Sequence, residues 1–405
     1  MKRRIVLLTN TCPFGGEVFL QNELKWIPHD QPVSLYPIFS GSKDAQTVSL
    51  NGNIEVQKIA SEWSVKERLK AGWSGLKMLL ATKEYIAAFR RPNSLRNIIK
   101  AFKFSYISEL RFNRIYQQLC AGRAKKQEYI LYSYWLYEVA YIAARLKQEL
   151  SSCRFVSRCH GFDLYEIRHL NGYLPFRNFI MESVDAVYPI SEDGREYISR
   201  LYHGKWDGKV QTMRLGTDDW GLNPVSIDSV PTIVSCSNLV DVKRVDRIID
   251  ALKSVNHPIR WYHFGDGPLR EQLEQKAREL PSHIESKFMG AVPNETLMCF
   301  YKEHHVDVFV NVSSSEGVPV SIMEALSFGI PAVATDVGGT HEIICDGENG
   351  YLIPVDFLNE MLCEAISRVL EQQNRDKFRK QAREAWERNC NASANYITFF
   401  RTITQ

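Results

Sequence analysis

The sequence predicts an α/β protein built from two similar domains in series. Short β-branched runs alternate with longer amphipathic segments through both halves of the chain, which is typical of parallel sheets with crossover helices. The length of 405 residues favours two or three domains, because domains usually run about 100 to 200 residues. We therefore expect two Rossmann-like, doubly wound domains.

Strand candidates divide the chain in two. In the first half they lie at 4–8, 33–39, 129–134, 154–159 and 185–189, with a loop at 10–16 and a helix at 19–27 after the first of them. The stretch 221–230 contains proline and has little helical pattern, so we interpret it as the hinge. Further candidates follow at 232–236, 259–264, 286–289, 306–312 and 332–335. The predicted domains are therefore 1–220 and 221–390.

The composition is that of a packed protein rather than a disordered one, with 44% hydrophobic and 24% charged residues. No run of about 20 apolar residues is long enough to span a bilayer. Residues 1–4 lead into a strand-like run and not into the apolar core of a signal peptide. We therefore expect a cytoplasmic chain.

Neither the cysteines nor the histidines form a metal-binding pattern. The nine cysteines are an odd number without a C-x-x-C pair, and the ten histidines show no H-E-x-x-H arrangement. No D-x-D pair is present that would hold a divalent cation beside a nucleotide. We predict no structural or catalytic metal and no cofactor.

Although the net charge is only +3, the segment 66–126 is strongly basic and contains 15 Lys or Arg and three Glu. Apolar residues recur there at helical spacing, namely Leu95, Ile98, Ile99, Phe102, Tyr106 and Leu110, with basic residues between them. Three interpretations stay open. The segment is a solvated helix face packed on the core of the first domain, or a surface for anionic lipid headgroups. Nucleic acid ranks lowest, because no binding module accompanies the charge.

The most informative stretch is 313–331, SSSEGVPVSIMEALSFGIP, directly after a predicted strand. Pro319 suits the first turn of a helix, because its fixed φ fits there. The free amides of Val318, Val320 and Ser321 would then point out of the helix start together with the positive end of its dipole, which is a ready anion site. Glu316 and Glu324 flank that site and suit polyhydroxyl groups on either side of a phosphate.

This stretch resembles the E-x7-E signature of the retaining glycosyltransferases of family 4, which have the two-domain GT-B fold. Further segments match the family in order, namely CPFGGE at 12–17, RCHGFD at 158–163, RLGTD at 214–218, GDGP at 265–268 with Gly290 beyond it, and GGTHE at 338–342. The resemblance covers the chain from about Arg4 to its end.

The resemblance implies a retaining transfer of a hexosyl group from a UDP- or GDP-sugar to a glycan or lipid-linked acceptor, without a metal. The reaction would lie in a central cleft that the two domains face, and the tail 391–405 would pack back on the first domain. It also implies cytoplasmic assembly of a polysaccharide, with the segment 66–126 resting on the inner face of the membrane as a peripheral contact.

The resemblance also implies roles for single residues. Glu324 would bind the ribose, the helix amides and Lys243 the diphosphate, and Glu316 the sugar hydroxyls. His160 would lie at the reacting sugar. The glycines Gly15 and Gly16 would let the backbone approach the donor, and Gly290 would lie near the base.

The segment 235–246, SCSNLVDVKRVD, departs from the phosphate-binding pattern of the family. Asn238 stands where arginine is usual, so one of two cationic contacts is lost. Arg244 stands where glycine is usual and is a candidate replacement for that contact. Glu342 has two equal interpretations, a residue of the loop that closes behind the donor or a carboxylate at a helix start.

Two other classes of function remain as alternatives. One is a non-catalytic partner subunit that binds a nucleotide sugar or a lipid for another enzyme. The other is a different GT-B enzyme, such as a sugar epimerase or a phosphorylase. For the retaining hexosyl transfer we expect a front-face route, because no carboxylate nucleophile other than Glu316 is evident.

Overall fold

The computed structural model describes residues 3–11, 18–39, 52–59, 62–121, 128–150, 152–225 and 230–405. The chain divides into two compact units. The first comprises Met1–Met213 with Ile397–Gln405, and the second comprises Arg214–Tyr396. The sequence had suggested domains 1–220 and 221–390, with the tail 391–405 on the first.

The first unit contains a six-stranded parallel sheet with the order β3-β2-β1-β4-β5-β6. Its strands are β1 (Arg4–Thr9), β2 (Val33–Pro37), β3 (Ile54–Val56), β4 (Tyr129–Ser133), β5 (Cys153–Cys159) and β6 (Ala186–Pro189). The strand order reverses at β1, so the connections run to opposite sides of that strand. This is the doubly wound arrangement.

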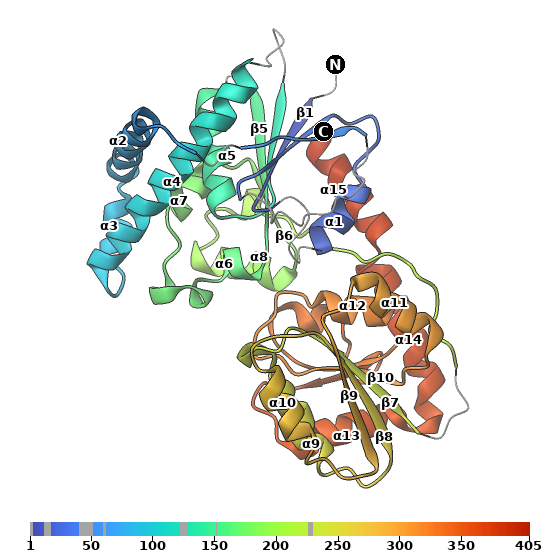
Figure 1. Cartoon of the computed structure of the whole chain (residues 1–405). Coiled ribbons are helices and arrows are strands. Elements are labelled where there is room, and N and C mark those ends of the chain that lie inside the picture. The colour runs from blue at the N-terminus through green and yellow to red at the C-terminus, as the bar shows by residue number, and fades with distance from the viewer. Residues whose placement is uncertain are drawn as a thin grey trace. The chain divides into compact units, whose positions relative to one another are not determined.

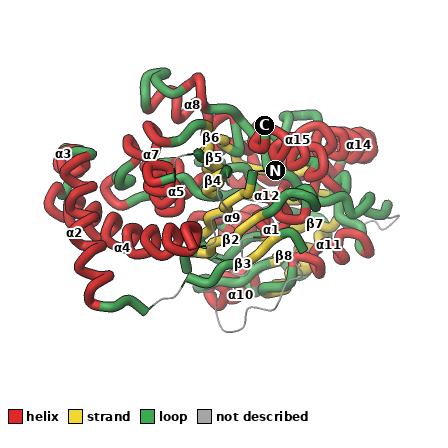
Figure 2. Tube along the Cα trace, turned by 90° about the horizontal axis from the view of Figure 1, so that it is seen from above, coloured by secondary structure: helices red, strands yellow, loops and turns green. Residues whose placement is uncertain are grey.

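Helices cover both faces of this sheet (Figure 1). The helices of the first unit are α1 (Val18–Lys25), α2 (Val65–Ala81), α3 (Glu84–Phe89), α4 (Ser94–Ala121), α5 (Glu138–Glu149), α6 (Gly161–Leu164), α7 (Arg177–Ser183), α8 (Glu192–Leu201) and α15 (Ala392–Thr404). Helices α4, α5 and α7 lie on one side, and α1 and α15 lie on the other. Helices α2 and α3 lie outside α4, away from the sheet, in both Figure 1 and Figure 2.

The second unit repeats this design. Its strands are β7 (Thr232–Cys236), β8 (Ile259–Phe264), β9 (Ile284–Gly290), β10 (Val308–Asn311), β11 (Ala332–Thr335) and β12 (Gly350–Ile353), in the order β12-β11-β10-β7-β8-β9. Its helices are α9 (Val245–Leu252), α10 (Arg270–Ala277), α11 (Asn294–Glu303), α12 (Val320–Ser327), α13 (Asn359–Leu370) and α14 (Gln372–Asn389). All strand pairs are parallel. The predicted fold class, two doubly wound α/β domains, is confirmed.

Two strands were not predicted. Strand β3 has three residues and β12 has four, and each lies at an edge of its sheet. A short edge strand needs few apolar residues, because one side of it pairs with nothing. Neither therefore shows the apolar run by which the other strands were recognised.

The helical prediction for the basic segment is confirmed, but its apolar residues divide between two faces of α4. Leu110 is buried, whereas Leu95, Ile99 and Phe102 are 72%, 47% and 37% exposed. The buried apolar residues of α4 are Ala101, Phe104, Leu110, Phe112, Ile115 and Leu119. Only part of the apolar set therefore packs on the core, because spacing alone does not show which of two apolar faces meets the core. Among the described residues, no helix is long and apolar enough to cross a membrane.

A buried ion pair connects the sheet of the first unit to α1. Arg158 on β5 lies 2.8 Å from Glu23 on α1, both side chains are fully buried, and the Tyr132 hydroxyl donates to Glu23 at 2.5 Å. Arg158 also donates to the Met213 carbonyl at 2.7 Å, and its guanidinium lies 3.8 Å from the ring of Phe399 on α15. Arg158 is therefore a core residue and not a surface one. Its strand β5 lies between β4 and β6, and both faces of the sheet are covered.

We predict that Arg158→Met destabilises the first unit by about 3 kcal/mol, because the substitution leaves the Glu23 carboxylate buried without its cation. Urea unfolding followed by circular dichroism measures the loss. The control is the double variant Glu23→Leu with Arg158→Met, which should recover part of that stability. A double variant less stable than the single one would contradict the explanation.

Candidate functional site

The candidate site of the second unit lies where β7 and β10 end side by side. These neighbours pair in parallel, with Val308 opposite Ile233 and Phe309 opposite Val234. The chain leaves β7 toward α9 and leaves β10 toward α12, in opposite directions along the sheet. In such sheets a crevice opens beyond the carboxyl ends of the strands at the point of reversal.

Helix α12 begins at Val320, one residue later than predicted, and Pro319 precedes it as the cap residue. The Pro319 carbonyl accepts from the Ile322 amide at 3.1 Å. Within the described part of the chain, the amides of Val318, Val320 and Ser321 donate to no protein acceptor. They remain available to an anion, as the sequence predicted.

The structure brings Glu316 and Lys243 together. The Lys243 ammonium lies 2.6 Å from Glu316 Oε1, and the two side chains are 24% and 12% exposed. Asn311 Nδ2, at the end of β10, lies 3.4 Å from the same oxygen. The resemblance implies that the carboxylate binds a sugar and the ammonium a diphosphate. Their contact means that one ligand can meet both.

The loop that carries Glu316 is fixed by hydrogen bonds to its neighbours. The Ser314 amide donates to the Val242 carbonyl at 2.8 Å, which connects this loop to the one after β7. The Thr335 hydroxyl, at the end of β11, donates to the Ser313 carbonyl at 2.5 Å. Loops after three strands therefore hold one another in place.

The segment Gly338–Glu342, a short 3-10 helix, packs directly against the Glu316 loop. The Gly339 amide donates to the Gly317 carbonyl at 2.6 Å. Gly338 has a φ of +53°, and a Cβ there would lie 2.2 Å from the Glu316 carbonyl oxygen. Only glycine allows this approach, so the predicted double glycine positions the Glu316 loop.

Arg244 makes contacts other than the predicted one. Its guanidinium donates to the carbonyls of Val312 at 2.8 Å and Val355 at 2.5 Å, and lies 3.4 Å from that of Ser313. Its φ is +49°, a conformation that explains why the resembling family has glycine here. These contacts favour a role in holding the loops rather than in replacing the cation lost at Asn238, which is an exposed residue after β7.

Glu324 lies on α12 and is 6% exposed. It accepts a hydrogen bond of 2.8 Å from Asn294 Nδ2 at the start of α11. Burial raises the pKa of Glu324 to about 7, and the bond from Asn294 opposes that rise. Burial also raises the pKa of the nearby Cys236 thiol to about 12, with Glu324 adding to the rise and Lys243 opposing it. The two charged side chains thus share one electrostatic environment.

The predicted glycines near the base lie at the ends of β8 and β9. The Gly265 amide donates to the Gly290 carbonyl at 2.9 Å, so the two loops are joined. A Cβ on Gly265 would lie 1.9 Å from the carbonyl oxygen of Ser237, next to Asn238. These contacts are those of closely packed loops around the end of β7.

Glu342 forms an ion pair with Arg214 at 2.8 Å, and its side chain is 7% exposed. It is the last residue of its 3-10 helix, so the interpretation as a carboxylate at a helix start is wrong. The pair joins the RLGTD stretch to the Gly338 segment inside the second unit. This contact is structural.

In the first unit, His160 follows β5 and precedes α6. Its ring centroid lies 4.4 Å from that of Trp135 and 4.8 Å from that of Tyr134. Asp163 accepts from the His160 amide at 2.7 Å and from the Leu136 amide at 2.6 Å, which ties together the loops after β4 and β5. Burial, with a smaller contribution from the Arg158 cation, holds the pKa of His160 well below its usual value. The imidazole is therefore neutral at pH 7.

Two predicted residues and the metal prediction are not tested by these contacts. Gly15 and Gly16 lie outside the described residues. In the part of the chain that the structure describes, no group of three or more His, Cys, Asp or Glu side chains could hold a metal ion. Metal independence stays a prediction.

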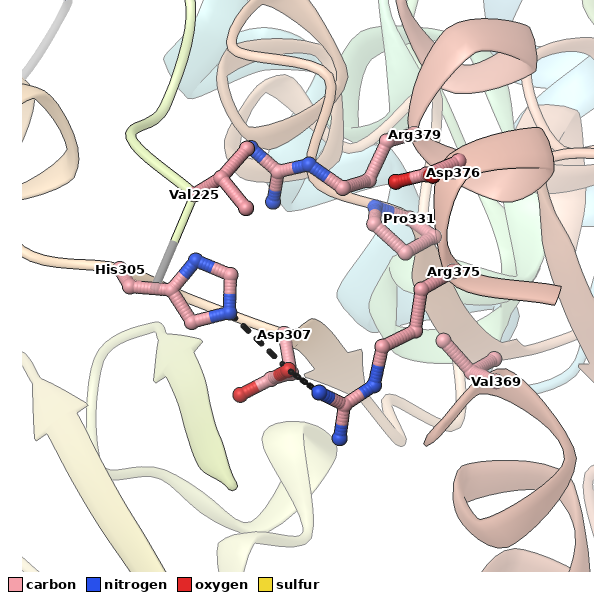
Figure 3. Close-up of a pocket in the computed structure, with 8 residues that line it drawn as sticks. All are labelled: Val225, His305, Asp307, Pro331, Val369, Arg375, Asp376 and Arg379. Carbon is pink, nitrogen blue, oxygen red and sulfur yellow. Dashed lines mark hydrogen bonds and ion pairs between the residues drawn. The ribbon is translucent and has the colours of Figure 1, made fainter. Parts of the chain in front are cut away.

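A pocket at the opposite edge of the second sheet has a volume of about 40 Å³ and is lined by paired side chains (Figure 3). His305 Nε2 lies 3.0 Å from Asp307 Oδ1, and Arg375 lies 3.7 Å from that oxygen. Asp307 Oδ2 accepts from the amide of Thr232, at the start of β7. The pocket therefore joins α14 to the amino ends of the strands and is remote from the crevice where ligands bind in such sheets.

Sequence reasoning missed four residues of these sites, namely Asn294, Asn311, Asp163 and Trp135. Asp163 and Trp135 had a local signal, since Asp163 follows His160 by three residues and Trp135 comes directly after a strand. Asn311 was counted only as part of a strand. Nothing near Asn294 in the sequence indicates that it reaches Glu324, which is thirty positions away.

Comparison with known proteins identifies the class. Residues 224–385 match the model of the family described as glycosyl transferases group 1. The match covers this part of the chain, and the predicted resemblance to glycosyltransferases is confirmed at this level. A curated relative is the putative colanic acid biosynthesis glycosyltransferase WcaL of Escherichia coli, 25% identical over 205 residues, which are 48% of this chain and 50% of that protein. The chain spans half or less of the length of the curated relatives it matches.

Solved structures show the same fold. The lipopolysaccharide outer core galactosyltransferase WaaB in its apo form aligns with a TM-score of 0.70 at 16% identity, covering 99% of both chains. HepE from Anabaena in complex with UDP and glucose aligns with a TM-score of 0.69 at 16% identity, covering 100% of both chains. Both structures have the two-sheet fold of this chain, and the predicted GT-B fold is confirmed.

We predict that Gly338→Ala displaces the Glu316 loop and destabilises the second unit. A positive φ alone costs about 1 kcal/mol for a residue with a Cβ, and the loss of stability should exceed that value. The matched control is Gly347→Ala, which also has a positive φ, +75°, but no atom within 4 Å of the added Cβ. Urea unfolding compares the two variants. Equal losses of stability would show that the Glu316 carbonyl does not oppose the added methyl group.

Proposed function

We propose that the protein is a retaining hexosyltransferase that moves a hexosyl group from a UDP- or GDP-sugar to a hydroxyl of a glycan or lipid-linked acceptor, without a metal. The proposal rests on one observation, the Lys243–Glu316 pair beside the free amides of α12 in a segment of the group 1 family. A cation, a carboxylate and a helix start together suit a sugar linked to a diphosphate.

Relatives support the donor and acceptor classes. HepE, which has the same fold, was solved with UDP and glucose, and WcaL is named for colanic acid biosynthesis. We propose for this chain a nucleoside diphosphate sugar and a polysaccharide or lipid-linked precursor. In the proposed complex Glu324 accepts from the ribose hydroxyls and Glu316 from the sugar hydroxyls.

The chemistry follows from where charge develops. As the bond between the anomeric carbon and the phosphate oxygen breaks, negative charge grows on the leaving diphosphate, and Lys243 with the amides of Val320 and Ser321 stabilises it. The acceptor oxygen bonds to the anomeric carbon on the face that the diphosphate leaves, and its proton passes to the leaving phosphate oxygen. We assign His160, a neutral imidazole, to hydrogen bonding at the reacting sugar.

We further propose that the protein works in the cytoplasm, in peripheral contact with the inner face of the membrane through the segment 66–126. The positive charge of that segment, 15 Lys or Arg against three Glu, suits anionic headgroups. A lipid-linked acceptor would be presented at the same surface.

Calorimetric titration with UDP-glucose, UDP-galactose and GDP-mannose, each with a chelator present, tests the donor. We expect one of them to bind under these conditions, and Lys243→Met to weaken that binding roughly tenfold, because a charge-assisted contact to the diphosphate is lost. Lys253→Met is the matched control, since Lys253 also pairs with a glutamate, Glu279 at 2.7 Å, and lies elsewhere in the second unit.

Three results would contradict the proposal. They are binding of none of the donors, loss of binding on chelation alone, and equal effects of the two lysine substitutions. Proton NMR of the product settles the stereochemistry, and an inverted anomeric centre would refute retention. Donor binding without transfer to any acceptor would favour the non-catalytic partner subunit instead.

Donor affinity should rise between about pH 6 and about pH 8, because the ribose hydroxyls need an ionised Glu324 as acceptor and its pKa is about 7. In the absence of donor, the free energy of unfolding changes with pH in the opposite direction. The folded-state pKa lies above the usual value, so the contribution of Glu324 to stability falls as the pH rises from about 4.5 through about 7. Calorimetry across this range measures the affinity.

Two variants separate Glu324 from other titrating groups. Glu324→Gln should remove the pH dependence of binding, because the amide does not ionise. Asn294→Ala should move the midpoint to higher pH, because the hydrogen bond that favours the ionised carboxylate is lost. A slope unchanged in Glu324→Gln would assign it to another residue.

A further inference from the structure

Helix α2 has a line of large apolar side chains on its exposed face. Val65, Leu69, Trp73, Leu76 and Leu80 follow one another at intervals of four, four, three and four, so they lie on one side of the helix. They are 74%, 71%, 63%, 37% and 57% exposed. The face that packs on the unit is a different one, formed by Ala71, Gly75, Met78 and Leu79.

A second such line lies on α4, which runs antiparallel to α2. Glu67 pairs with Arg114 at 2.7 Å, and a Cβ on Gly75 would lie 3.0 Å from Ser105 Oγ, so low numbers on one helix meet high numbers on the other. The line on α4 consists of Leu95, Ile99 and Phe102, which are 72%, 47% and 37% exposed.

Both lines face the same side. Counted at about 100° per residue, the line on α4 lies roughly a quarter turn from the contact between the helices and the line on α2 nearer to half a turn, in the same rotational sense. In an antiparallel pair, rotations of the same sense from the contact lead toward the same side. The eight residues therefore form one curved surface, the α2–α4 apolar face, and Figure 2 shows α2 on the outer part of the unit with α4 running inward from it.

Cations border this face. Lys66, Lys70 and Lys77 each follow a residue of the α2 line by one position, and Arg96 and Lys103 do the same on α4. Among the described residues none of these five has a carboxylate partner within salt-bridge distance, and all five are exposed. Apolar side chains in the middle with unpaired cations beside them are typical of helices that lie in a bilayer interface.

We propose that the α2–α4 apolar face docks in the plane of an anionic lipid bilayer, with its apolar side chains in the acyl boundary and its lysines on lipid phosphates. This rests on the proposed membrane contact of 66–126 and specifies it, since burial of the apolar side chains, and not charge alone, holds the protein there. A second copy of the chain is a poorer occupant, because it would place two sets of unpaired cations against each other.

Flotation with phosphatidylglycerol-containing vesicles tests the proposal at about 0.1 M and about 1 M NaCl, between which the Debye length falls from about 10 Å to about 3 Å. We expect wild type to bind at low salt and to keep part of that binding at high salt. The variant with Leu69→Ser, Trp73→Ser and Leu80→Ser should lose at least tenfold in affinity at both. Neutralising Lys66, Lys70 and Lys77 should weaken binding mainly at low salt.

The matched control is Leu358→Ser, a leucine of the second unit that is 67% exposed. It should bind vesicles as wild type does. Undiminished binding by the triple serine variant, or complete loss of wild-type binding at high salt, would overturn the proposal. A dimer in light scattering that the triple serine variant abolishes would show that a second copy covers the face.

Donor titration of the same variants separates this inference from the proposed function. If a variant loses vesicle binding but binds the donor as wild type does, the substitution affects only the docking face. A wild-type protein that binds vesicles but no nucleotide sugar would refute the proposed transferase and leave the docking face standing.

Discussion

The pairing of β7 with β10 is the constraint on which the candidate site depends. Because the two strands run parallel and their connections leave in opposite directions, the loops that follow them meet at one edge of the sheet. Lys243 comes from the first of these loops and Glu316 from the second, so the two residues of the pair lie far apart in the sequence. Sheet order, and not local chain geometry, therefore creates the charged pair beside α12.

Close backbone packing then fixes that edge. The absence of a Cβ at Gly338 and Gly265 lets the carbonyls of Glu316 and Ser237 approach closely. Arg244 donates hydrogen bonds to three further carbonyls. Main-chain atoms thus position the loops, which leaves the side chains of Lys243, Glu316 and Glu324 for a ligand. A site fixed in this way needs little rearrangement when a ligand enters, and preorganised dipoles are most effective where charge develops.

Much of this could be predicted from the sequence, because strand runs and the E-x7-E segment are local patterns. The start of α12 at Val320, one residue from the predicted position, follows from one short segment that also carries Glu316 and Glu324. The burial of Arg158, the engagement of Arg244 and the approach of Asn294 to Glu324 could not be predicted. Each depends on a partner far along the chain. The exposed line on α2 was missed for another reason, since a helix apolar on two faces has the same periodic signal whichever face is buried.

Helix α15 begins in the second unit and ends in the first. Its Phe399 covers the guanidinium of Arg158 and packs against Tyr132 on β4 and Tyr188 on the edge strand β6. During translation the ribosome therefore releases this ring only after the whole second unit has been synthesised. The core of the first unit is therefore completed by residues that follow the second unit in the sequence, and before their synthesis the guanidinium of Arg158 lacks this aromatic cover.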